Sequence, residues 1–169
     1  FYIDAESLIK RAYVLRQEGW REKENIGYYQ RMFEAKKISS MRKYLTENSR
    51  VFINNIISTI AENQIKLFDR KGNPIIINDK GEFEGDNAST NVTPALIEIN
   101  DECNIIGLID GQHRTYAYHE GDDIYEPHIA KLRKIQNLLV TGILFPQKES
   151  KESRLKFEAN LFLEINLNQ

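Results

Sequence analysis

Five consecutive residues combine the side chains most suited to chemistry in this chain: Asp110, Gly111, Gln112, His113 and Arg114. They follow an apolar run that predicts a strand and precede residues that predict a helix. A glycine at such a turn can adopt positive φ and has no Cβ to obstruct a ligand. The N–H groups and dipole at the start of the helix favour an anion. The pattern therefore predicts a phosphate site.

Three side chains of this segment have complementary roles at a phosphate. Arg114 offers planar bidentate donors, and His113 can donate a hydrogen bond or carry a proton near pH 7. Asp110 could hold Mg²⁺ or orient a water beside a polyphosphate. The same residues also fit an ordinary strand-to-helix turn, in which Asp110 caps the helix and Arg114 forms a surface salt bridge. The residues alone leave both interpretations open.

Residues 108–117, Leu-Ile-Asp-Gly-Gln-His-Arg-Thr-Tyr-Ala, resemble the signature of the DGQHR-domain family, which includes the DndB-like proteins of bacterial DNA phosphorothioation systems. They are also similar to the Asp-Gly-Gln-Gln-Arg motif of modification-dependent restriction NTPases and, more distantly, to the Gly-x-x-Arg box of the ParB and sulfiredoxin superfamily. Residues 29–31 and 37–45 are similar to the family's upstream Gln-Arg segment and helix. Residues 162–166, with Gln169, resemble its closing Phe-x-x-Ile-Asn box.

The resemblance implies a ParB/sulfiredoxin-like fold that binds a nucleoside triphosphate, with ATP and Mg²⁺ as the expected cofactors. It makes Asp110, His113 and Arg114 candidate catalytic residues. The candidate nucleotide-binding residues are Gly111, Gln112, Arg31 as a second cation, and Asn166 at the far edge. Family members act on or regulate chemically modified DNA. His113 in place of a second Gln places this chain nearer the DndB-like members, and hydrolysis of the nucleotide is left open.

The elements that must position these residues mix helices and strands without a regular βαβ alternation, which favours an α+β fold. Asp4 is a predicted N-cap for a helix whose apolar residues include Leu15. Further helices are predicted over residues 34–47, 128–135 and 149–165. Strands are predicted over residues 51–60, 65–68, 75–77, 96–99, 105–109 and 138–145, and a loop over 79–93. We expect a helical extension at 1–27 and the DGQHR domain at 28–169, both belonging to a longer chain.

The chain has 169 residues with 23 Lys and Arg against 25 Asp and Glu, a net charge of −2. This balance excludes a broadly basic nucleic-acid coat. Four cations at positions 36, 37, 42 and 43 form either a solvated helix face or a local DNA-binding patch. There is one cysteine, Cys103, and no apolar run long enough for a membrane span, so we expect a cytoplasmic protein without membrane contact. The oligomeric state is left open.

The other candidate site residues, histidines, a cysteine and aromatic residues, have weaker functional interpretations. The spacing of His113, His119 and His128 does not suit a zinc site, and Cys103 has no neighbouring cation to activate it. Aromatic residues such as Tyr116 and Tyr118 either stack on a base or pack in the core. Two functional hypotheses follow: a nucleotide-binding domain of a bacterial or phage DNA-modification or defence system, with or without hydrolysis, and a DNA-binding transcriptional regulator of a modification operon that uses no nucleotide. A purely structural module is the third.

Overall fold

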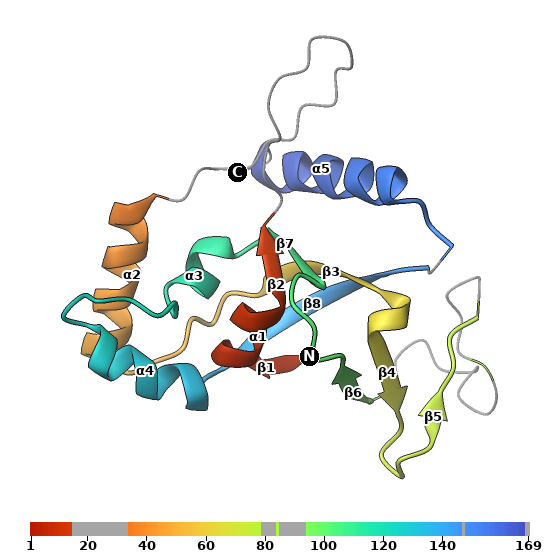
Figure 1. Ribbon diagram of the computed structural model, residues 1–169, viewed down its shortest axis with the longest axis horizontal. Coiled ribbons are helices and arrows are strands. Elements are labelled where there is room, and N and C mark those ends of the chain that lie inside the picture. The colour runs from red at the N-terminus through yellow and green to blue at the C-terminus, as the bar shows by residue number, and fades with distance from the viewer. Residues whose placement is uncertain (15–33, 79–83, 85–93, 147, 168–169) are drawn as a thin grey trace.

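The computed structural model describes residues 1–14, 34–78, 84, 94–146 and 148–167 (Figure 1). The described elements, in chain order, are β1 (Tyr2–Asp4), α1 (Ala5–Arg11), β2 (Ala12–Val14), α2 (Ala35–Asn48), β3 (Ile56–Ala61), the short 3₁₀ turn η1 (Glu62–Gln64), β4 (Ile65–Phe68), β5 (Pro74–Ile75), β6 (Leu96–Ile99), β7 (Ile106–Asp110), α3 (Gln112–Tyr116), α4 (Glu126–Ile135), β8 (Asn137–Phe145) and α5 (Lys151–Leu167). The predicted α+β class is confirmed, because a mixed sheet packs against helices.

The main sheet has five strands in the order β1-β8-β3-β7-β2. β3 at its centre runs parallel to β8 and antiparallel to β7. β1 pairs antiparallel with β8 at one edge, and β2 pairs parallel with β7 at the other. This order brings β7, the strand that leads into the predicted phosphate turn, between the central strand and an edge.

Alternate residues of β3 and β7 face two different cores, as the period of a strand requires. Ile56, Ile60, Ile106 and Leu108 are buried in a large cluster with side chains of α1, α2 and α4. The opposite face is covered by α5, whose Phe162 packs with Ile109 in a smaller cluster. Figure 1 shows α5 on one side of the sheet and α1, α2 and α4 on the other. The end of β7 is therefore enclosed by helices from both sides.

A buried polar contact attaches α5 to the sheet. Glu158 is fully buried, and its Oε1 accepts hydrogen bonds from Thr59 and from Tyr13 at 3.2 Å. Arg154 donates to the same oxygen at 3.1 Å. A Cβ at Gly107 would lie 2.6 Å from the Thr59 hydroxyl, so this position on β7 has room only for glycine. The polar contact fixes where α5 lies on the sheet.

A second sheet of three strands, in the order β5-β4-β6, lies beside the main one (Figure 1). Its hairpin between β4 and β5 turns at Asp69, whose Oδ1 accepts from the backbone N–H groups of Lys71 and Asn73, both at 2.8 Å. Gly72 in this turn has φ 87°. The hairpin predicted around residues 69–74 is confirmed, because it depends on local turn chemistry.

The first helix is shorter than the sequence pattern predicts. Asp4 caps it as expected, accepting from the Ser7 N–H at 2.8 Å. The helix ends at Arg11, however, and residues 12–14 leave it to pair with β7. Pairing with a neighbouring strand overrides the local helical spacing. Residues 2–4 and 12–14 of the expected N-terminal helical extension thus form both edge strands of the main sheet.

The remaining predicted elements agree in type, and β4 and β6 have the predicted bounds. α2, α4, β8 and α5 begin and end within two residues of the sequence expectations. β3 begins at Ile56, so residues 51–55 of the predicted strand lie outside it. Residues 79–83 and 85–93 of the predicted loop lie outside the described residues. Among the described helices, none combines the length and the apolar character needed to cross a bilayer.

Candidate functional site

The strand-to-helix turn predicted at Asp110–Arg114 is present at the end of β7. Gly111 adopts φ 88° and ψ 12°, the left-handed region that favours glycine. A Cβ at this position would lie 2.8 Å from Cγ1 of Ile56 and 3.0 Å from Nη2 of Arg114. Both the backbone conformation and the close packing therefore require glycine here.

The helix that follows is too short to give the strong dipole that the sequence pattern favours. α3 contains five residues, little more than one turn. Few peptide dipoles are aligned in such a helix, so its field at the N-terminus is weak. Attraction of an anion to this turn has to come mainly from side chains.

Asp110 and Arg114 form an ion pair, with Nη2 of Arg114 3.0 Å from Oδ2 of Asp110. The same Nη2 donates to the carbonyl oxygen of Asn55 at 2.9 Å. Nε of Arg114 is buried and has no hydrogen-bond partner among the residues that the structure describes. Asp110 makes no side-chain cap to α3. Of the two contacts expected for an ordinary strand-to-helix turn, the salt bridge of Arg114 is present and the cap by Asp110 is not. Arg114 also retains one buried donor, its Nε.

His113 and Gln112 are buried, at 7% and 6% exposure. The backbone N–H of Glu34 donates to Nε2 of His113 at 3.3 Å. A ring nitrogen that accepts carries no proton, so this contact places the proton of a neutral imidazole on Nδ1. His113 therefore acts here as a hydrogen-bonding group that links α3 to the residue preceding α2.

The turn forms one wall of a small cavity of about 70 Å³. Its lining consists of Lys37, Met41, Ile109, Asp110, Gly111, Gln112, His113, Arg114 and Phe162. The charged groups in this lining are two cations, Lys37 and Arg114, and one carboxylate, Asp110. The positive excess suits an anion, and the phosphate site stays a prediction.

The described lining of the cavity offers Mg²⁺ a single carboxylate, that of Asp110. The ion prefers six oxygen ligands and usually takes one or two carboxylates together with phosphate oxygens. Asp110 supplies one carboxylate, which already holds Arg114. No group of three or more His, Cys, Asp and Glu side chains that could hold a metal occurs among the described residues. The Mg²⁺ site at Asp110 stays a prediction.

A larger pocket of about 620 Å³ adjoins the small cavity, because Lys37 and Met41 line both. Its other walls come from α2 and from residues 50–54, the segment before β3. Pockets of this volume accommodate small organic ligands. Sequence reasoning missed it, although Lys37 and Tyr44, which are seven positions apart, share one face of the predicted helix.

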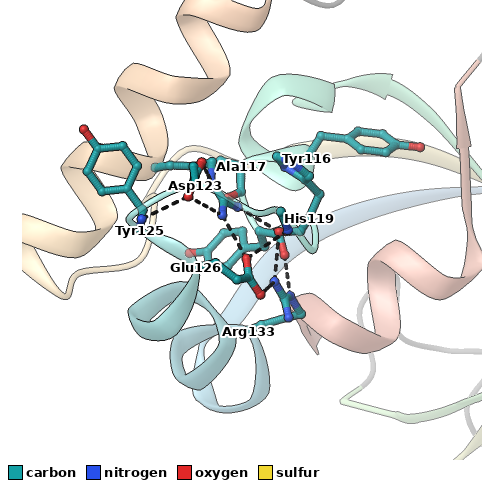
Figure 2. Close-up of polar contacts among 10 residues, drawn as sticks. Tyr116, Ala117, His119, Asp123, Tyr125, Glu126 and Arg133 are labelled. Carbon is teal, nitrogen blue, oxygen red and sulfur yellow. Dashed lines mark hydrogen bonds and ion pairs between the residues drawn. The ribbon is translucent and has the colours of Figure 1, made fainter.

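A buried ion network holds α2 and α4 around the residues that follow α3 (Figure 2). Arg42 is 1% exposed and donates to both carboxylate oxygens of Asp123, at 2.7 and 3.0 Å. It also donates to Glu126 at 2.8 Å and to the carbonyl oxygens of Ala117 and His119. The expectation that Arg42 lies on a solvated face or a DNA-binding patch is wrong. Its partners come from the end of α3, from the loop between α3 and α4, and from α4 itself, which no local pattern of α2 reveals.

Glu126 extends the network to a second arginine. Its Oε1 accepts from Arg133 at 2.8 Å, while its Oε2 accepts from Arg42. Arg133 is itself buried and donates to the carbonyl oxygens of Tyr118 and His119. In Figure 2 the side chains of Glu126 and Arg133 meet below the loop that carries His119. The network satisfies carbonyl groups just after α3 and so fixes the path of the chain that leaves the candidate site.

Two further predicted site residues fall outside what the structure describes, and one tyrosine lies in the core. Arg31 is outside the described residues. Asn166 belongs to α5, and its side chain is outside them as well. Tyr118 is fully buried and donates to Gln136 at 2.5 Å, so it packs in the core. The structure thus brings together Asp110, Gly111, Gln112, His113 and Arg114, and adds Lys37 to them.

No family model, curated protein or solved structure matches this chain.

Proposed function

We propose that this chain binds nucleotides through a phosphate site formed by Arg114, Lys37 and the Gly111 turn, and that it does so within a DNA-modification or defence system. The observation that carries the binding proposal is the small cavity whose lining holds two cations and one acid. The biological setting rests on the resemblance of residues 108–117 to the DGQHR-domain family.

Each residue of the cavity has a defined part in this proposal. Arg114 donates from its guanidinium, including the buried Nε that has no partner among the described residues. Lys37 contributes a second charge from α2. Gly111 allows the positive-φ turn that packs against Ile56 and Arg114, which a Cβ would prevent. The proposal is limited to binding, because Asp110, the acid expected to assist hydrolysis, is held by Arg114.

Calorimetric titration with inorganic phosphate and with ATP tests the proposal. Lys37→Ala should weaken binding of both by about tenfold or more, since a hydrogen bond to a charged group contributes about 1.5–3 kcal/mol. Lys43→Ala is the matched control, because Lys43 lies on the same helix but pairs with Glu47 on an exposed surface. Equal affinities of the two variants would contradict the site.

Asp110→Asn should change the phosphate affinity in the direction opposite to Lys37→Ala. Removing the negative charge releases Arg114 and raises the positive potential of the cavity, so phosphate should bind several-fold more tightly. If Asp110 instead held an essential Mg²⁺, the same variant would weaken nucleotide binding. Tighter binding by Asp110→Asn therefore supports the anion site formed by side chains.

A further inference from the structure

The larger pocket beside the phosphate cavity has an aromatic wall. Tyr44 of α2 and Phe52 stack with their ring centroids 5.6 Å apart and an interplanar angle of 17°. Phe52 also makes an edge contact with the buried ring of Tyr118, at 6.2 Å and 85°. The second contact fixes the orientation of Phe52. A fixed aromatic wall is the surface on which nucleobases stack.

Polar groups stand around this wall. Ser40 and Asn54 line the pocket with Arg50, and both Asn54 and Arg50 are exposed. An amide and a hydroxyl are the donors and acceptors that read the edge of a base or the hydroxyls of a sugar. The pocket thus combines an apolar face with polar groups at its rim, as pockets for small organic ligands do.

The size of the phosphate cavity limits how many phosphoryl groups enter it. Its volume of about 70 Å³ is roughly a ninth of the 620 Å³ of the adjoining pocket. The small cavity therefore favours a single phosphoryl group over a chain of three. A second or third phosphate would also add negative charge close to the Asp110 carboxylate, which lines the same cavity.

We infer that the pocket pair holds a nucleoside monophosphate unit, with the base against Tyr44 and Phe52 and its single phosphate beside Arg114. This inference rests on the proposed phosphate site and adds to it a nucleoside subsite and a limit of one phosphate. Lys37 and Met41, which line both spaces, lie where the sugar joins the two groups. The inferred ligand differs from the triphosphate that the sequence resemblance implies.

Calorimetric titration of the full chain with the four common nucleoside monophosphates, the matching triphosphates and inorganic phosphate tests the inference. We expect at least one monophosphate to bind about tenfold or more tightly than phosphate, because a stacked base adds affinity. We expect it to bind no more weakly than its triphosphate. A triphosphate that binds tenfold more tightly than its monophosphate would overturn the limit of one phosphate.

Variants separate the base subsite from the phosphate site. Phe52→Leu keeps an apolar contact with Tyr118 and should lose the advantage of the monophosphate over phosphate, while phosphate itself binds unchanged. Phe68→Leu, in β4 of the small sheet, is the matched control and should change neither affinity. Asn54→Ala removes an exposed amide and should alter the ranking of the four bases without unfolding the chain.

The outcomes distinguish the two proposals. If phosphate binds and Phe52→Leu leaves the monophosphate affinity unchanged, the base subsite is wrong and the phosphate site stands. If neither phosphate nor any nucleotide binds to the folded chain, both are wrong. If the monophosphate binds through Phe52 but Lys37→Ala has no effect, the base subsite stands and the position of the phosphate is wrong.

Discussion

Arg42 and Asp123 are joined by two hydrogen bonds, Nε to Oδ2 at 2.7 Å and Nη2 to Oδ1 at 3.0 Å, although they are 81 positions apart in the chain. This bidentate pair joins α2, which lines both candidate pockets, to the loop between α3 and α4. Since Arg42 is buried, its contribution differs from that of the other cations of α2. We expect the stability of the candidate site to depend on this pair.

Arg42→Ala should lower the free energy of unfolding by about 3–5 kcal/mol, because it leaves Asp123 and Glu126 without their shared cation. Lys43→Ala on the exposed side of the same helix should change it by less than about 0.5 kcal/mol. Urea denaturation of the two variants measures the difference. Similar stabilities of both variants would contradict the buried network.

Acid should destabilise the protein through the same network. Hydrogen bonds from Arg42 lower the pKa of Asp123 in the folded state. Burial opposes the shift at Glu126, but hydrogen bonds from Arg42 and Arg133 outweigh it and lower that pKa too. A carboxylate with a lowered folded pKa contributes stability above its unfolded value of about 4, and this is lost as the pH falls.

We therefore expect the unfolding free energy of the wild type to decrease as the pH falls below about 5. In Asp123→Asn one of the two carboxylates is absent, so the pH dependence should be shallower. Thermal unfolding followed by circular dichroism at pH 3, 4, 5 and 7 gives both curves. Parallel curves for the two proteins would show that Asp123 does not contribute.

Alkaline pH should affect a different part of the fold. Burial and the neighbouring Glu158 raise the pKa of Tyr13 to about 12. A tyrosine whose folded pKa is raised contributes stability that is present below its unfolded pKa of about 10 and is lost as the pH rises towards 12. We expect Tyr13→Phe to reduce this alkaline dependence, while the buried Tyr118, whose pKa is also raised by burial, retains the rest. Spectrophotometric titration of tyrosine ionisation, combined with unfolding at pH 9 to 12, measures it.

Substituting two glycines that have the same φ distinguishes two costs of adding a Cβ, backbone strain and steric crowding. Gly72 and Gly111 have φ 87° and 88°, but a Cβ at Gly72 has nothing within 4 Å, whereas one at Gly111 lies 2.8 Å from Ile56. Gly72→Ala should cost about 1–2 kcal/mol from the left-handed conformation alone. Gly111→Ala should cost about 1–3 kcal/mol more, because it also overpacks the core. Chemical denaturation measures the loss of unfolding free energy in both variants. Equal losses would contradict an added cost from crowding at Gly111.

Local chemistry explains which elements the sequence predicts correctly. The Asp4 cap, the Asp69 turn and the apolar face of α2 each depend on residues within a few positions of one another. The turn at Gly111 is predicted for the same reason, since a strand, a glycine and a helix follow in direct succession.

Contacts between distant segments account for what the sequence does not predict. Ala12 continues a helical spacing, yet it joins a strand because β7 provides a partner. The neighbours of Arg42 in the sequence are those of an exposed helix residue, yet residues 117–126 bury its side chain. The adjoining pockets likewise need α2, the segment at 50–54 and the turn at Gly111 together. The residues of any single helix or strand do not reveal these contacts.

The strand order β1-β8-β3-β7-β2 has a consequence for the time course of folding. No two neighbours in this sheet follow one another in the chain, and the N–H of Phe1 reaches the carbonyl of Val140, 139 positions away. On a ribosome, the central strand β3 must wait for β7 and then for β8 before it is paired on both sides. High contact order of this kind slows folding, whereas the small β4-β5 hairpin can close early. β3 therefore stays unpaired on one side until β8 has been synthesised, and the small cavity is complete only when α5 supplies Phe162.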